Sequence, residues 1–176
     1  MGKTIAYSPN NYIKKRDFIM KKITALVLLL TFVFALASCG SKEPTQLGTS
    51  DLSILLPRGY AATEDDFDQD QVAYFYKDNN SLDFDVYQWA KGEEYALETE
   101  AEYFATQYGT VPQAVTYNGI AGWKYVTTED YEGISYTVLN YMFEDDTSIV
   151  EICFWTNGSD SEYKVVEEIL SSLAKK

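Results

Sequence analysis

The chain has 176 residues and a net charge of −13, from 14 Lys and Arg against 27 Asp and Glu. It contains no His, which excludes Ser-His-Asp and Cys-His catalysis and removes the commonest zinc ligand. The acidic balance argues against a nucleic-acid partner, because phosphates repel such a surface. Its Gly residues are scattered singly, so neither a phosphate-binding loop nor a dinucleotide fingerprint is present.

An apolar run extends from Ile23 to Ala37 and follows the basic pair Lys21 and Lys22. The run is shorter than the roughly 20 apolar residues that a membrane-spanning helix needs. A basic segment followed by a short apolar run is typical of a signal peptide. We therefore expect residues 1–38 to be a signal peptide, with 1–19 either an over-extended start or a long basic region.

The run closes on Leu36-Ala37-Ser38-Cys39, which resembles the signal of bacterial lipoproteins. The resemblance implies cleavage between Ser38 and Cys39 and attachment of fatty acyl chains, such as palmitate, at Cys39. Two acyl chains give lasting attachment at about 0.8 kcal/mol per buried methylene. The expected location is the extracytoplasmic face of the cell membrane. The alternative is an uncleaved signal anchor with Cys39 as an accidental thiol.

Cleavage would leave 8 Lys and Arg against 26 Asp and Glu, a net charge of −18. Residues 39–50 are expected to be the lipidated Cys and a flexible linker, because 40–50 are rich in Gly, Ser, Thr and Pro. Residues 51–176 suit one globular domain. Cys153 is then its only thiol, so the domain has no internal disulfide.

Alternating apolar residues and turn signals predict a series of strands joined by hairpins, the clearest at Asn118-Gly119. The predicted strands are residues 51–56, 72–77, 82–90, 113–118, 120–128, 133–143 and 147–156. Helical spacing from about Glu93 to Tyr108 predicts a first helix. A capping box at Ser159 and Glu162, followed by an apolar stripe from Val166 to Leu173, predicts a second. The fold class is α+β, a mainly antiparallel sheet with helices packed on its faces.

This order resembles the PsbP-like α/β/α sandwich, a fold named for a photosystem II extrinsic protein and shared by small bacterial lipoproteins. The resemblance lies in Leu55-Leu56-Pro57-Arg58-Gly59-Tyr60, in Gly122-Trp123-Lys124-Tyr125 and in residues 166–173. It covers nearly all of residues 51–173. It implies an accessory or binding protein without catalysis, and no ligand-binding residue is implied by it.

An acidic loop contains Asp66, Asp68 and Asp70, which have the spacing of the first ligands of a helix-loop-helix calcium site. The later positions of that motif fail, since Gln71 stands where Gly is required and Lys77 where a bidentate Glu is required. A solvated loop is the expectation, with a weak calcium site as the alternative. No metal or other cofactor is expected.

Aromatic residues alternate along the strands on what should be the second face of the sheet. They are Tyr87, Trp89, Trp123, Tyr125 and Trp155. Exposed aromatic faces bind sugars or peptides, whereas a covering helix would make these residues part of a core. Cys153 shares this face with Glu151 and is expected to be a structural thiol.

These patterns predict a non-catalytic, lipid-anchored accessory or binding protein of the bacterial cell envelope, with an envelope protein or small ligand as partner. Two alternatives stay open. One is an envelope hydrolase that uses a carboxylate pair, although 26 acidic residues allow too many pairs for one to be named. The other is a weak calcium-binding acidic module.

Overall fold

The computed structural model describes residues 43–63, 70–78, 82–92 and 96–176. The expected signal peptide with Ser38 and Cys39 lies outside the described residues, and so do Asp66 and Asp68. Among the described helices, none has the length and apolarity needed to cross a membrane.

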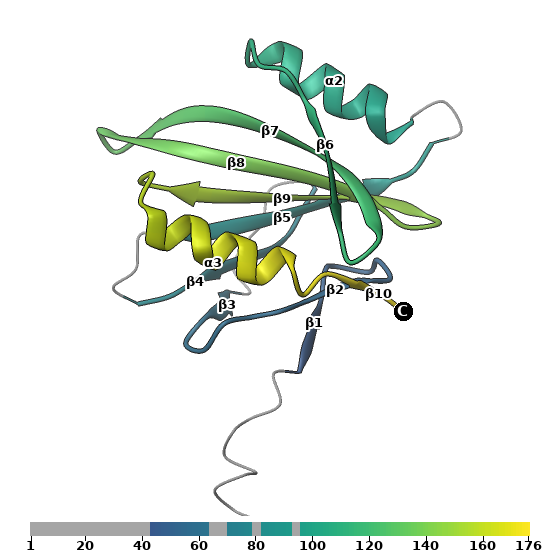
Figure 1. Cartoon of the computed structure of the whole chain (residues 1–176), viewed down its shortest axis with the longest axis horizontal. Helices are drawn as coiled ribbons and strands as arrows, with labels where there is room; N and C mark the ends of the chain where they lie inside the picture. Colours follow the sequence, from purple (N-terminus) through teal and green to yellow (C-terminus); the bar gives the residue numbers. More distant parts are fainter. Residues whose placement is uncertain (1–42, 64–69, 79–81, 93–95) are drawn as a thin grey trace, which may run out of the picture. The chain divides into compact units, whose positions relative to one another are not determined.

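A central antiparallel sheet organises the described part of the chain (Figure 1). Its seven strands lie in the order β3-β4-β5-β9-β8-β7-β6. They are β3 (Ala61–Thr63), β4 (Gln71–Tyr76), β5 (Asp83–Ala90), β6 (Gln113–Tyr117), β7 (Ile120–Tyr131), β8 (Ile134–Glu144) and β9 (Ser148–Thr156). A smaller antiparallel sheet, in the order β1-β2-β10, contains β1 (Pro44–Gln46), β2 (Leu52–Leu55) and β10 (Ala174–Lys175).

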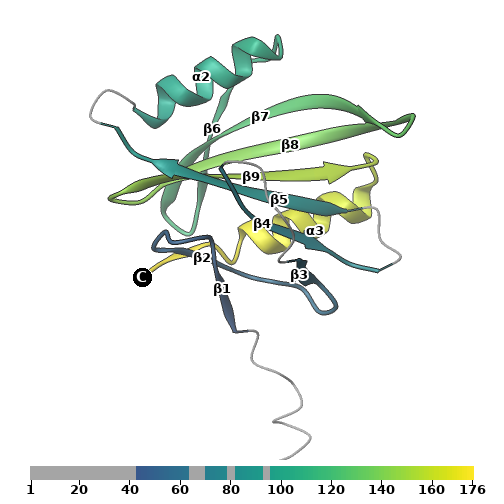
Figure 2. The ribbon, with the colours of Figure 1, turned by 180° about the vertical axis from the view of Figure 1, so that it is seen from behind.

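The helices α2 (Leu97–Gln107) and α3 (Asp160–Leu170) lie on opposite faces of the central sheet, as Figures 1 and 2 show from two sides. The predicted capping box begins α3: the hydroxyl of Ser159 accepts a hydrogen bond from the backbone N–H of Glu162, whose side chain bonds back. The predicted turn at Asn118-Gly119 joins β6 to β7, with both residues at positive φ. The predicted fold class is therefore confirmed.

The main core lies between the first face of the sheet and α3. Phe84, Tyr141, Phe143 and Phe154 are almost fully buried there, and Ile169 of α3 packs with them. These strand residues share one face because side chains alternate along each strand.

The segment 43–50 differs from the expected flexible linker. Residues 44–46 form β1, which pairs with β2, and Leu47 is fully buried in the main core. The turn that follows favours Gly48, whose φ of +61° is a backbone conformation that other residues rarely adopt. A three-residue strand with one apolar anchor has no detectable period, so composition alone predicted a linker. The folded domain begins at least seven residues earlier than predicted.

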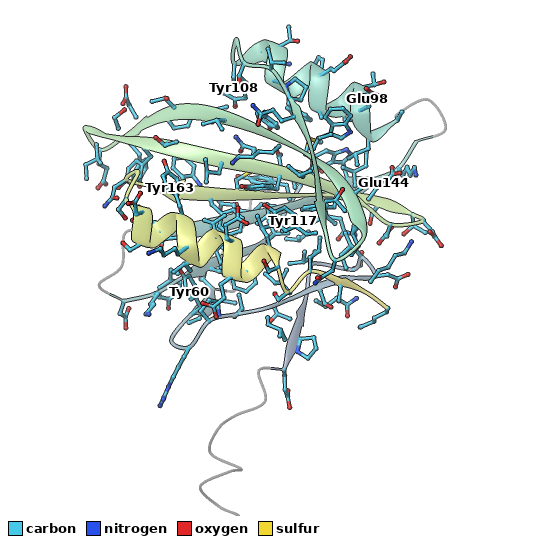
Figure 3. The ribbon with its side chains drawn as sticks, viewed as in Figure 1. Tyr60, Glu98, Tyr108, Tyr117, Glu144 and Tyr163 are labelled. Atoms are coloured by element: carbon cyan, nitrogen blue, oxygen red, sulfur yellow. The ribbon has the colours of Figure 1, made fainter. Side chains whose placement is uncertain are left out.

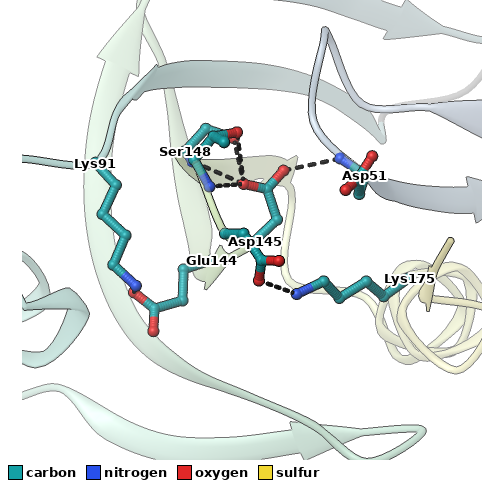
Figure 4. A network of polar contacts seen from close by, with 8 residues as sticks. Asp51, Lys91, Glu144, Asp145, Ser148 and Lys175 are labelled. Carbon is teal, nitrogen blue, oxygen red and sulfur yellow. Dashed lines mark hydrogen bonds and ion pairs between the residues drawn. The ribbon is translucent and has the colours of Figure 1, made fainter.

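Asp145 ties the β8–β9 turn to the start of β2 (Figure 4). One carboxylate oxygen accepts hydrogen bonds from the backbone N–H groups of Thr147 and Ser148, both at 2.7 Å, and the other accepts one from the N–H of Asp51 at 2.8 Å. Burial raises the pKa of Asp145, but these donors outweigh it and set the pKa at about 2. The two ion pairs nearby, Lys91 with Glu144 and Lys175 with Asp146, lie nearer the surface.

Replacing Asp145 by Asn should destabilise the domain by roughly 1–2 kcal/mol at neutral pH. The NH₂ group of Asn would face backbone N–H groups that now donate to the carboxylate, and two donors cannot bond to each other. A depressed pKa stabilises the fold above the unfolded value near 3.8 and loses that contribution as pH falls towards 2. The difference between wild type and Asp145→Asn should therefore shrink below pH 4 in urea unfolding measured from pH 2 to 7. Asp146→Asn is the control, and an equal loss in that variant would contradict the assignment.

Candidate functional site

The second face of the central sheet carries a polar and aromatic set of side chains. Strand pairing puts Asp85 of β5 opposite Cys153 of β9, which lies opposite Asn140 of β8, which lies opposite Tyr125 of β7. The next row places Tyr87 opposite Glu151. Residues at alternate positions share a face, so one continuous surface crosses four strands.

Helix α2 covers only part of this surface. Leu97, Ala101 and Ala105 of α2 pack with Met142 of β8 and Ile149 of β9 in a second, smaller core. The remaining part borders a cavity of about 930 Å³, which we call the α2 cavity. Its walls come from α2, from the turn after it and from strands β5, β7, β8 and β9. This volume is in the range of small-molecule sites.

Aromatic rings form much of the cavity wall. The predicted residues Tyr87, Trp89, Tyr125 and Trp155 all line it. Trp123 does not, since it packs against the smaller core under α2. Both expectations for this face therefore apply in part. Some of the rings are covered by the helix, and others face the cavity.

Three further rings come from α2 and the turn after it, and sequence reasoning missed them. Phe104 lies 5.8 Å from Trp89 between ring centroids, and Tyr108 stacks on Tyr125 at 6.5 Å. Tyr103 joins Phe104 at 5.4 Å and is 58 % exposed. Figure 3 labels Tyr108 near the end of α2, on the far side of the sheet from Tyr163 of α3. Helical spacing predicted the helix itself, but it gave no sign that these three rings border a cavity.

Asp85 lies in the cavity wall with both oxygens occupied. The indole N–H of Trp155 donates to Oδ2 at 2.6 Å, and the amide of Gln71 donates to Oδ1 at 2.6 Å. Burial raises the pKa of Asp85, the hydrogen bond from Trp155 opposes the rise, and Asp83 nearby adds to it. Two neutral donors therefore hold the carboxyl group of Asp85 in place, and no basic side chain of the described residues pairs with it.

Glu151 is the more deeply buried carboxyl group, with 7 % of its surface exposed. The hydroxyl of Tyr125 donates a hydrogen bond to its Oε1. Burial raises the pKa of Glu151 to about 7, although hydrogen bonds from Tyr125 and Cys153 favour the ionised form. Glu151 therefore exchanges its proton near neutral pH, which is unusual for a structural carboxyl group.

Cys153 is buried beside Glu151, as expected of a structural thiol. Burial raises the pKa of its thiol well above the ordinary value, and the charges of Glu151 and Asp85 raise it further. The thiol stays protonated at neutral pH, so it is not poised for nucleophilic attack.

The cavity wall has five carboxyl groups and no basic side chain among the described residues. Besides Asp85 and Glu151, the acids are Glu100, Glu129 and Asp70, the last of which ends the acidic loop. Within the described ranges, no three acidic or Cys side chains converge closely enough to hold a metal ion. The sequence placed Glu151 on this face together with Cys153, but the importance of Glu151 and Asp85 follows only from the cavity that they line.

Neither a protein-family model nor a curated protein sequence matches the chain. Solved structures do match its fold. CyanoP, the cyanobacterial PsbP of Synechocystis sp. PCC 6803, aligns with a TM-score of 0.58 and 11% identity over 78% of this chain and 95% of its own. LpqN of Mycobacterium tuberculosis, which is involved in cell envelope biogenesis, aligns with a TM-score of 0.55 and 9% identity over 75% and 88%.

A third match is a protein of Bacteroides thetaiotaomicron, with a TM-score of 0.55 and 16% identity over 74% of this chain. The chain spans about half of the length of that protein, 49%. Together with the strand order and the two helices, the match to CyanoP identifies the fold as PsbP-like. At these identities the likeness establishes the fold alone.

The raised pKa of Glu151 predicts a particular pH dependence of stability. A folded-state pKa near 7, against 4.5 when unfolded, stabilises the fold below pH 4.5 and loses that contribution as pH rises through 7. Relative to Glu151→Gln, the wild-type free energy of unfolding should fall by on the order of 3 kcal/mol between pH 4 and 8.

Urea unfolding across that range measures the difference. Glu102→Gln, which removes an exposed acid on α2, should keep the wild-type pH dependence. Equal pH profiles for wild type and Glu151→Gln would contradict the assignment.

Proposed function

We propose that this protein is a lipid-anchored, extracytoplasmic accessory protein of the bacterial cell envelope that binds a small ligand in the α2 cavity and leaves it chemically unchanged. The observation on which the proposal rests is the cavity itself, a space of about 930 Å³ with aromatic walls and oriented carboxylates. A closed apolar core would have been more stable than buried acids that no described basic side chain pairs with, so the cavity is best explained by a ligand.

The envelope location is proposed from two supports. One is the lipoprotein-like sequence Leu36-Ala37-Ser38-Cys39 after the apolar run. The other is the PsbP-like fold shared with LpqN, a protein involved in cell envelope biogenesis. A domain that begins by residue 44 then follows Cys39 closely, so the domain would be held near the membrane surface.

A carboxylate-dependent hydrolase is the rival function, favoured by one observation: Asp85 and Glu151 lie on neighbouring strands in the same cavity. Paired carboxyl groups with different pKa values suit acid-base hydrolysis. Against it, both oxygens of Asp85 already accept hydrogen bonds from Trp155 and Gln71, and Oε1 of Glu151 accepts one from Tyr125. Binding therefore accounts for the geometry better than turnover.

Filling the cavity should remove the ligand. Val138 lines the α2 cavity and is 3 % exposed, so Val138→Trp would project an indole into the open space. Native mass spectrometry of protein purified from its own membranes should show a bound small molecule in wild type and about tenfold less in Val138→Trp.

Val126→Trp is the matched control, since Val126 is 40 % exposed and lies outside the cavity wall. An unchanged ligand level in Val138→Trp, or no bound molecule in wild type, would contradict binding at this site. A cleaved product whose formation stops in Glu151→Gln would instead favour the hydrolase.

The lipid anchor has its own test. Cells fed an alkyne fatty acid should label the wild-type protein, and Cys39→Ser should lose the label and leave the membrane fraction. Cys153→Ser is the control that keeps the label, because Cys153 is buried in the fold. A wild-type chain that retains residues 1–38 and an unmodified Cys39 by mass spectrometry would overturn the envelope assignment.

A further inference from the structure

We propose that the α2 cavity selects an organic ammonium ion, with the charged nitrogen held between the aromatic rings and the carboxylates of Asp85 and Glu151. This inference rests on the proposed function and specifies the class of its ligand. It follows from the kinds of side chain in the cavity wall and from those that are missing there.

The aromatic part of the wall suits a cation. Trp89 and Tyr87 come from β5 and Trp155 comes from β9. Tyr108, directly after α2, adds a further ring. Ammonium groups bind against the faces of such rings, and Trp is the strongest partner among them. Rings from several elements around one cavity resemble the aromatic cages that hold quaternary ammonium groups.

The charge of the wall disfavours an anionic ligand. No described Lys or Arg lines the cavity, so an anionic ligand would meet five acids and no counter-charge. Two Lys residues that follow or precede lining residues in the sequence are engaged elsewhere: Lys91 pairs with Glu144 at 2.8 Å, and Lys124 lies over the ring of Tyr141 on the opposite face. Asp85 and Glu151 accept hydrogen bonds only from neutral groups among the described residues, so a positively charged ligand would provide their counter-charge.

The raised pKa values of side chains near these acids reflect the same negative potential. Burial raises the pKa of Tyr108, and Glu129 and Glu151 raise it further. Burial likewise raises the pKa of the Cys153 thiol, with Glu151 and Asp85 as the next causes. A metal ion is a poorer fit than an organic cation, because the acids of the described chain do not converge in threes.

Paired probes of equal shape test the inference. Choline and its neutral isostere 3,3-dimethylbutan-1-ol differ in one positively charged nitrogen, so their difference in affinity measures recognition of charge. Calorimetric titration of the full domain should show choline binding at least about tenfold more tightly than the alcohol. Quenching or shift of tryptophan fluorescence from Trp89 and Trp155 provides the second readout.

Variants link the charge preference to the cavity. At pH 8, where Glu151 is mostly ionised, Glu151→Gln keeps the shape and should weaken choline binding by roughly fivefold to tenfold while leaving binding of the alcohol unchanged. Asp85→Asn should act in the same direction, and Glu102→Gln on the outer surface of α2 should change neither probe. Val138→Trp should weaken both probes, because it removes space.

The outcomes separate this inference from the function on which it rests. Equal affinities for choline and the alcohol, both lost in Val138→Trp, would overturn the ammonium preference and keep the cavity as a binding site. A neutral or anionic molecule recovered from the native protein would do the same. Binding of neither probe to wild type, with no ligand recovered from membranes, would overturn both.

Discussion

The unequal covering of the two faces of one antiparallel sheet is the constraint on which the rest of the structure depends. Side chains alternate along each strand, so every residue of β5, β7, β8 and β9 belongs to one face or the other. On the first face α3 and the smaller sheet complete a core of fully buried rings and aliphatic groups. On the second face an eleven-residue helix covers only part of the surface, and the remainder borders the α2 cavity.

That imbalance explains the chemistry of the second face. A closed sandwich would have apolar residues on both faces of its sheet, and Met142 and Ile149 supply them where α2 packs. Where α2 does not cover the sheet, the strands carry the polar residues Asp85, Glu151 and Asn140 instead of apolar ones. Buried carboxyl groups held by neutral donors lower stability compared with apolar residues of similar volume. Their presence where the cover ends fits a surface shaped for binding.

Much of the fold could be predicted from the sequence, because strand alternation and turn chemistry are local signals. The Asn118-Gly119 turn and the Ser159–Glu162 capping box depend only on residues close in the chain, and both formed as expected. Strand β1 could not be predicted, since its pairing with β2 depends on one buried residue, Leu47, in a polar segment.

The site was predictable only in part. Alternation placed five aromatic residues on one face of the sheet, and four of them border the cavity. The rings of Tyr103, Phe104 and Tyr108 reach the cavity from α2 and the turn after it, and nothing in the local pattern distinguishes them from packing residues. The raised pKa of Glu151 depends on burial by elements distant in sequence, which a single strand cannot indicate.

Indole N–H resonances give the most direct test that the open part of the second face is a ligand site. The chain has three Trp residues, of which Trp89 and Trp155 border the cavity and Trp123 does not. Titration of nitrogen-labelled protein with tetramethylammonium, followed by NMR, should shift the Trp155 signal most, since its N–H bonds to Asp85. The Trp123 signal should stay in place. Equal shifts of all three signals, or none up to the highest concentration, would contradict the account.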